Sequence, residues 1–302
     1  MQPFSVTFWG VRGSYPAPGP KTAGVGGNTP CVEVRVGQHT IILDAGTGII
    51  GLGRELAARY RATQEPITAT LFFTHTHHDH TQGFPFFVPA RFQMTNLYIF
   101  GPQSLHQDLE EVLSRSMLPP VFPITLDELP CLRVVENLKE GHAVVLNNAD
   151  RIPRVIQIER EADKIRPEDV VIRVMHSYAH PSGVFTYRVE CDGRAFVYAT
   201  DNEGYVGGDA RLVKFARGAD WLVHDAQYTE AEYAHPDSPR QGWGHSTWNM
   251  AVAVAQAAQV KRLALFHHEP DHDDVTLAQI EQDAQVIFPN TVLAREGMTV
   301  EL

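Results

Sequence analysis

Apolar and polar positions alternate in two distinct ways along the first part of the chain. Within residues 4–8 and 32–36 every second side chain is apolar, a period that predicts half-buried strands. Short continuous apolar runs are typical of strands buried on both faces. Such runs predict buried strands at residues 40–43, 70–73, 97–100, 170–174, 185–189, 195–199, 221–224 and 263–266.

Helical periodicity lies between these runs, at residues 51–61, 105–114, 209–217, 247–259 and 276–288. We expect Ser246 to cap the fourth helix and Asp274 the fifth, because short oxygen-bearing side chains satisfy free N–H groups at a helix start. Strands dominate the first third and alternate with helices afterwards, which favours sheets covered by helices.

The chain shows no repeat, low-complexity tract or long linker, so we expect one domain spanning residues 1–302. The segment from Asn147 to Glu168 is charged and weakly periodic. We expect a surface loop there, with a flap over the active site as the functional alternative, since structureless loops of this length are uncommon without a role.

Composition excludes several classes: 43% hydrophobic and 20% charged residues do not suit a disordered, collagen-like or coiled-coil chain. The net charge of -11 argues against a nucleic-acid polymer as partner, because phosphate binding needs clustered cations. It does not exclude a small anionic substrate, since bound metal ions can reverse the local field.

The cysteines Cys31, Cys131 and Cys191 are isolated and odd in number, which predicts free buried thiols in a reducing compartment. The first residues lack a basic stretch followed by an apolar one, and no apolar run is long enough to span a membrane. We therefore expect a cytoplasmic protein without membrane association. A homodimer is left open.

The densest chemical signal is the run His75-Thr76-His77-His78-Asp79-His80, directly after an apolar strand. Neutral imidazoles and carboxylates are ligands that zinc, manganese and iron accept. One such run offers too few ligands for two metal ions, so others should come from further strand ends. Candidates there are His180, Asp201 and His267, with His176 competing with His180 and His268 with His267.

The pattern His75-x-His77-x-Asp79-His80 resembles the signature of the metallo-β-lactamase-fold hydrolases. Asp44-Ala45-Gly46-Thr47-Gly48 resembles the early Asp-containing turn of that family, and further motifs match in order from about Phe8 to His267. The resemblance implies an α+β, αββα sandwich: two mixed β-sheets packed face to face, with helices on the outer faces.

The same resemblance implies two divalent metal ions. Zinc is the first assignment, with manganese or iron as alternatives. One ion would be held by His75, His77 and His180, the other by Asp79, His80 and His267, with Asp201 bridging them. A hydroxide between the ions would be the nucleophile. Asp44 would orient a ligand histidine, and His78 would point elsewhere.

Gly244-His245-Ser246-Thr247 resembles a motif of the phosphodiesterase branch, which includes tRNA 3′-end-processing endonucleases and cyclic phosphodiesterases. The resemblance implies that His245 protonates the leaving oxygen and that Asp225 orients it, so Asp79, Asp225 and His245 are the expected catalytic residues. Arg12 or Asn28, in Gly-rich turns, could touch a phosphate or brace the metal loops.

The leading hypothesis is therefore a phosphodiesterase that hydrolyses a small cyclic phosphodiester, either a cyclic nucleotide or a phosphoribosyl cyclic phosphate. Three alternatives stand beside it: an RNA-processing nuclease of the tRNA 3′-end type, a lactone or thioester hydrolase, and a non-catalytic metal-binding scaffold. The fold alone does not choose among them, because one fold hosts many chemistries.

Overall fold

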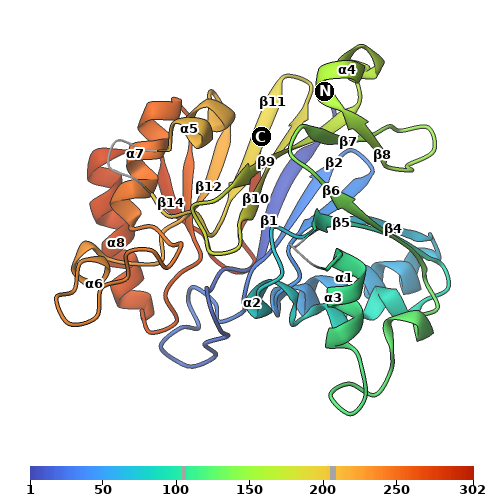
Figure 1. Ribbon diagram of the computed structural model, residues 1–302, viewed down its shortest axis with the longest axis horizontal. Helices are drawn as coiled ribbons and strands as arrows, with labels where there is room; N and C mark the ends of the chain where they lie inside the picture. Colours follow the sequence, from blue (N-terminus) through green and yellow to red (C-terminus); the bar gives the residue numbers. More distant parts are fainter. Residues whose placement is uncertain (104–106, 205–208) are drawn as a thin grey trace.

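Two mixed β-sheets pack face to face in the computed structural model, which describes residues 1–103, 107–204 and 209–302 (Figure 1). Among these residues the first sheet has seven strands, in the order β15 (Thr299–Glu301), β1 (Phe4–Gly10), β2 (Cys31–Val36), β3 (His39–Leu43), β4 (Ile67–Phe72), β5 (Thr95–Pro102) and β6 (Leu132–Leu138). The second has eight, in the order β14 (Thr291–Leu293), β13 (Leu263–Phe266), β12 (Trp221–Asp225), β11 (Arg194–Ala199), β10 (Val184–Cys191), β9 (Val170–Ser177), β7 (His142–Leu146) and β8 (Arg154–Gln157).

Helices cover the outer face of each sheet, which confirms the predicted αββα sandwich (Figure 1). The first sheet is covered by α1 (Gly48–Thr63) and α3 (Leu109–Ser116), and the second by α5 (Ala210–Ala216), α7 (Trp248–Ala258) and α8 (Asp274–Ile287). Shorter turns complete the chain: α2 (His78–Thr81), α4 (Ile158–Glu161), α6 (Glu230–Tyr233), η1 (Phe84–Phe86), η2 (Val88–Arg91), η3 (Leu126–Glu128) and η4 (Ala162–Lys164). No helix of the described residues is long and apolar enough to cross a membrane.

Aromatic rings join the two sheets across the core. Phe8 on β1 meets Phe266 on β13 with ring centroids 6.1 Å apart, and Phe72 on β4 meets Tyr187 on β10 at 5.1 Å. All four side chains are buried, and aromatic pairs at such distances add to the free energy gained from burying their area. The core thus fixes the ends of β4 and β13 relative to each other, where the candidate ligands begin.

The two predicted helix caps are each wrong by one residue. Thr247 caps α7 by accepting from the N–H of Met250, while the hydroxyl of Ser246 is used in a bond to the carbonyl of Asn202. Asp273, not Asp274, caps α8. The helix predicted at 105–114 begins at Leu109 in the structure, and residues 105 and 106 lie outside the described residues.

The segment from Asn147 to Glu168 does not form the predicted flap or a plain loop. It contains β8, α4 and η4, and β8 pairs antiparallel with β7 at the edge of the second sheet. Ile156 packs there with Ala143 and Val145. Strand β8 lies away from α2 (Figure 1). The apolar residues of this segment pack in a small local core, which its weak periodicity did not predict.

Candidate metal centre

The ends of several strands converge at one edge of the sandwich. His75 follows β4, Asp201 follows β11 and His267 follows β13 directly, while His180 lies in the connection between β9 and β10. Strands β3, β4 and β5 are parallel to one another, as are β11, β12 and β13, so their carboxyl ends reach the same edge of each sheet. Polar side chains at such ends face a shared crevice.

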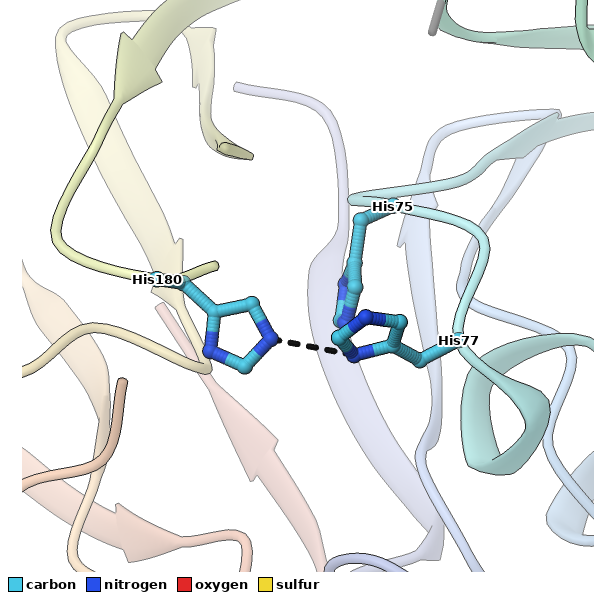
Figure 2. A group of neighbouring side chains, drawn as sticks. All are labelled: His75, His77 and His180. Carbon is cyan, nitrogen blue, oxygen red and sulfur yellow. Dashed lines mark hydrogen bonds between the residues drawn. The ribbon is translucent and has the colours of Figure 1, made fainter. Parts of the chain in front are cut away.

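His75, His77 and His180 form the first group of ligand atoms (Figure 2). Nδ1 of His180 donates to the carbonyl of Gly244 at 3.1 Å, so its Nε2 carries a lone pair and faces Nδ1 of His77 at 3.0 Å. Nε2 of His75 is buried and bonds to no described residue. A buried ring nitrogen without a partner is unfavourable, and a bound cation would satisfy it.

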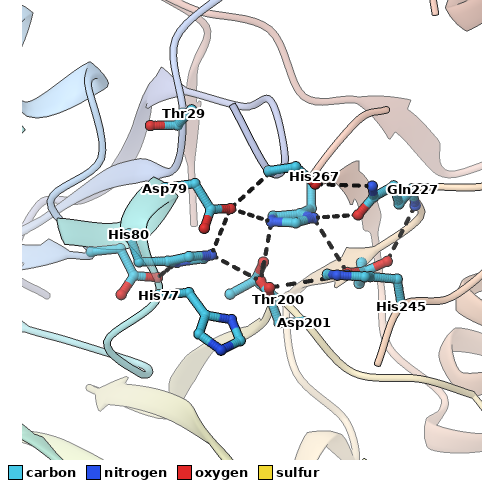
Figure 3. A network of polar contacts seen from close by, with 12 residues as sticks. Thr29, His77, Asp79, His80, Thr200, Asp201, Gln227, His245 and His267 are labelled. Atoms are coloured by element: carbon cyan, nitrogen blue, oxygen red, sulfur yellow. Dashed lines mark hydrogen bonds and ion pairs between the residues drawn. The ribbon is translucent and has the colours of Figure 1, made fainter. Parts of the chain in front are cut away.

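Asp79, His80, Asp201 and His267 form the second group (Figure 3). Nδ1 of His80 donates to Asp44 at 2.9 Å, which leaves its Nε2 lone pair 3.3 Å from Asp79 and 3.2 Å from Asp201. Nε2 of His267 lies 3.2 Å and 3.4 Å from the same two carboxylates. Lone pairs and carboxylate oxygens gathered at this spacing repel one another unless a cation lies among them.

Asp201 faces both groups with its two carboxylate oxygens. Its Oδ1 lies 3.7 Å from Nε2 of His75 and 4.0 Å from Nε2 of His180, whereas Oδ2 faces His80 and His267. The ligand atoms of each group lie within 4.8 Å of one another. This donor set of imidazoles and carboxylates fits two divalent cations that share one carboxylate.

The two groups differ in their electrostatics. Burial lowers the pKa of His75 and brings that of His180 to about 4, so both rings are neutral, as metal ligands must be. In the second group burial also opposes charge, but Asp201 and its acidic neighbours outweigh it. They hold the pKa of His80 well above its ordinary value and raise that of His267 to about 9. The second group is therefore a pocket that favours positive charge.

Three residues of the centre have left-handed backbone, with φ of 62° at Asp44, 52° at Asp201 and 61° at His267. Each follows a strand end, and the turn lets its side chain reach the crevice at once. Such conformations cost about 1–2 kcal/mol in a residue with a Cβ atom and persist where the surroundings enforce them.

Asp44 is hydrogen-bonded to His80, which fits its predicted role of orienting a histidine of the candidate centre. Besides His80, its carboxylate accepts from the backbone N–H of Thr74 at 2.8 Å and from the hydroxyl of Tyr198 at 3.0 Å. The hydroxyl of Thr74 donates to it as well, and a carboxylate held by four donors keeps the His80 ring in one orientation and one tautomer.

Gln227 and Ser14 belong to the centre although sequence reasoning missed them. Oε1 of Gln227 accepts from Nδ1 of His267 at 3.1 Å, and the N–H of Ser14 donates to Asp79 at 2.9 Å. Gln227 stands two residues after Asp225, but a lone Gln at a strand end carries no distinctive pattern. A backbone donor such as that of Ser14 leaves no trace in the side-chain sequence at all.

His245 lies beside the candidate ligands (Figure 3), and Asp225 is hydrogen-bonded to it. Nδ1 of His245 donates to Asp225 at 2.8 Å and lies 4.0 Å from Oδ1 of Asp201. The ring stacks on His267 with centroids 4.9 Å apart and planes at 12°. Its Nε2 bonds to no described residue, so this nitrogen is available to a substrate.

The competing residues lie outside both ligand groups. His78 is exposed, His176 is half-buried without belonging to either group, and His268 donates to the carbonyl of Ala294 at 2.9 Å. Arg12 is buried and donates to the carbonyls of Gly26, Glu269 and His272, and Asn28 donates to Glu296. Of the two roles predicted for Arg12 and Asn28, the hydrogen bonds fit bracing of the loops.

Two cavities border the centre on either side of the His180 connection. One of about 280 Å³ is lined by His75 and His77, and one of about 640 Å³ by His180 and the exposed Tyr178. Both are also lined by His176. His75, His77 and His180 therefore line space that a substrate could fill.

The chain belongs to the β-lactamase superfamily: the model of the family described as "Beta-lactamase superfamily domain" matches residues 39–268. The fold is shared with solved structures over nearly the whole chain. The metallo-β-lactamase fold protein YhfI from Bacillus subtilis superposes with a TM-score of 0.66 at 16% identity, and each chain is covered completely. The short form of human tRNase Z superposes with a TM-score of 0.62 at 21% identity, covering 98% of both chains. The protein is thus a hydrolase of the metallo-β-lactamase fold, as expected from the sequence.

Among its relatives is the Ribonuclease Z of Picrophilus torridus, 26% identical over 316 residues that cover 97% of this chain and 94% of the relative. Other relatives of 25–28% identity carry the same name. These nuclease relatives overturn the leading hypothesis of a small cyclic phosphodiester substrate and the expectation that no nucleic-acid polymer is a partner. The second error has a physical reason: net charge averages over the surface, whereas polyanion binding depends on local charge.

Proposed function

We propose that the protein is a metal-dependent phosphodiesterase that cleaves RNA, of the kind that processes the 3′ ends of tRNA precursors. The substrate class is supported by relatives named Ribonuclease Z along almost the whole chain and by a fold shared with human tRNase Z. The two cavities of about 640 Å³ and 280 Å³ beside the candidate ligands are where the RNA would enter. In this proposal residues 1–302 act as one domain in the cytoplasm.

The observation that carries the reaction class is the Asp225–His245 pair beside the metal ligands. Asp225 accepts from Nδ1 of His245, which directs Nε2 toward the substrate and stabilises the protonated ring. Nε2 can then give its proton to the leaving ribose oxygen, a poor leaving group unless it is protonated. The N–H of Ser246 holds the other oxygen of Asp225 at 2.9 Å, so the carboxylate cannot rotate away.

Seven residues would hold two divalent ions, with zinc as our first assignment and manganese or iron as alternatives. When bound, such ions supply Lewis acidity, which activates water at neutral pH and offsets the charge of the scissile phosphate. The neutral rings of His75 and His180 can offer a lone pair to a cation without losing a proton first. The N–H of Ser14 donates to the Asp79 carboxylate and holds it in position. The proposed ligands are His75, His77 and His180 for one ion, Asp79, His80 and His267 for the other, and Asp201 for both.

Cleavage of a tRNA precursor that carries a 3′ extension tests the proposal. The zinc- or manganese-loaded protein should cut once near the end of the acceptor stem, lose this activity to a chelator and regain it with metal. Replacing His245 with Ala should abolish cleavage, while the matched control His78→Ala, an exposed histidine outside both ligand groups, should not.

Two results would overturn the proposal. One is a fully metal-loaded protein that cleaves neither precursor nor other RNA but hydrolyses a lactone or thioester. The other is RNA cleavage that the His245→Ala variant retains in full, because the proton donor would then be assigned wrongly.

A further inference from the structure

A cavity of about 480 Å³ on the second sheet carries an excess of positive charge. Its lining residues come mainly from β9, β10 and α5. Helix α5 covers the outer face of the second sheet (Figure 1). Five cationic side chains line the cavity against two carboxylates, Glu140 and Glu190, which leaves a formal excess of three positive charges. We call this the basic cavity, and its cations are Arg173, Arg188, Arg211, Lys214 and Arg217. The whole chain, by contrast, has a net charge of -11.

The ion pairs within the basic cavity leave part of its charge unmatched. Glu190 is shared by Arg173 at 2.6 Å and Arg188 at 2.7 Å, so one carboxylate faces two guanidinium groups. The exposed side chains of Lys214 and Arg217 make no ion pair with any described residue. Two free cations beside a half-neutralised pair form the kind of local field that attracts phosphate.

The basic cavity is also rigid. Arg188 donates to the backbone carbonyls of Phe215 and Arg217, at 2.9 Å and 3.3 Å, and so ties the end of α5 to β10. Arg173 and Arg188 are directly paired across the two strands. Arg173 and Arg188 are therefore presented from fixed positions, which reduces the entropy lost on binding.

The basic cavity lies within reach of a polynucleotide that is bound at the metal centre. Arg173 stands four residues before the end of β9 at Ser177, about 13 Å at roughly 3.3 Å per residue, and the chain then leads into His180. The three residues from Ser177 to His180 extend this path, so the Cα atoms of Arg173 and His180 lie at most about 25 Å apart at up to 3.6 Å per residue. At about 3.4 Å of rise per phosphate along one strand, that limit corresponds to about seven nucleotides. A polynucleotide with one phosphodiester at the ligands can reach the basic cavity, whereas a small phosphodiester cannot.

We propose that the basic cavity binds the phosphate backbone of the RNA whose scissile bond lies at the metal centre. The inference rests on the proposed function and extends it with a docking surface. Contacts to phosphates position a nucleic acid without reading its sequence, which suits an enzyme that accepts many RNAs of one shape.

The test compares two double charge reversals of equal net change. Lys214→Glu with Arg217→Glu alters the basic cavity, and Arg54→Glu with Arg160→Glu alters exposed arginines on α1 and α4 that form no ion pair with a described residue. For each protein we would measure equilibrium binding and cleavage of a tRNA precursor at several salt concentrations. Turnover of bis(p-nitrophenyl) phosphate reports the centre alone.

The basic-cavity variant should bind the precursor at least about tenfold more weakly, with a salt slope lower by roughly one for each phosphate that the protein no longer neutralises. Its turnover of the small substrate should stay within about twofold of wild type, because both changed side chains are exposed, belong to neither ligand group and have their field screened by salt. RNA binding equal to that of the control pair would overturn the inference, as would a parallel loss of small-substrate turnover. Should the reversal fail to fold, Lys214→Gln with Arg217→Gln gives the same test without new negative charge.

Failure of the proposed function is distinguishable from failure of this inference. If the wild-type protein cleaved no RNA, the proposed function would fall, and equilibrium binding would still decide on the basic cavity. Salt-dependent binding that disappears in the variant would support the inference in that case, and absence of RNA binding by the wild type would overturn it.

Discussion

Replacing Asp225 with Asn separates the charge of this side chain from its shape. Oδ1 of Asp225 accepts from the backbone N–H groups of Ser246 at 2.9 Å and Gln227 at 3.2 Å, so the amide oxygen of Asn takes that position. Its NH₂ group then faces Nδ1 of His245. The ring must accept at Nδ1 and carry its proton at Nε2 as a neutral tautomer, without a carboxylate to stabilise the imidazolium.

The expected loss follows from the bond that disappears. A hydrogen bond to a charged group contributes about 1.5–3 kcal/mol, and about 1.36 kcal/mol corresponds to tenfold. The rate constant kcat for a tRNA precursor, whose ribose leaving group needs a proton, should therefore fall about 10- to 150-fold. Turnover of bis(p-nitrophenyl) phosphate should change little, because p-nitrophenolate leaves without protonation.

Both rates would be measured on the same preparations, with metal content per chain determined alongside. The metal analysis is the control, because Oδ2 of Asp225 lies 3.5 Å from Nδ1 of His267 and its loss could disturb that ligand. With metal content intact, an equal loss on both substrates would refute the assignment of His245 as proton donor. Unchanged cleavage of the precursor would refute it as well.

Three further predictions concern the architecture of the centre. A Cβ atom at Gly13 would lie 2.4 Å from Nδ1 of His267, so Gly13→Ala should displace that ring and lower the metal bound per chain; full metal content would contradict this close approach. Tyr198→Phe removes a buried donor to Asp44 and should lower the free energy of unfolding by about 1–2 kcal/mol in denaturant titrations. An unchanged free energy of unfolding would contradict this prediction. In metal-free protein the pKa of His267 is raised from 6.5 to about 9, so its charge stabilises the fold fully below pH 6.5. That contribution should be lost as pH rises through about 9, and a Tm that stays level across this range would contradict it.

Much of the candidate centre could be predicted because its proposed ligands follow strand ends. Asp201 and His267 come directly after apolar runs, and an α/β architecture brings such ends to one edge. The rest depends on tertiary hydrogen bonds without a local signature. The N–H of Ser14 reaches Asp79 across 65 residues of sequence, and Gln227 reaches His267 across 40.

The predictions of the helix caps and of the substrate were wrong for different physical reasons. Two adjacent residues could cap each helix. A tertiary hydrogen bond decides between Ser246 and Thr247, because the hydroxyl of Ser246 donates to the carbonyl of Asn202 and leaves the cap to Thr247. The prediction that no nucleic acid binds was wrong because the net charge of -11 is a sum over the whole chain and says nothing about local charge. Arg173 and Lys214, 41 residues apart in the sequence, meet only once β9 and α5 are packed together.

The left-handed backbone at Asp44, Asp201 and His267 places stability and activity in opposition at the same positions. Relief of about 1–2 kcal/mol at each would amount to about 3–6 kcal/mol, a large part of the roughly 5–15 kcal/mol that keeps a typical domain folded. Backbone strain alone would favour glycine at these positions, whereas hydrogen bonds such as those that Asp44 accepts from Thr74 and Tyr198 oppose that change. A library sorted on folding would therefore balance strain against these hydrogen bonds, whereas a library sorted on RNA cleavage should keep all three side chains.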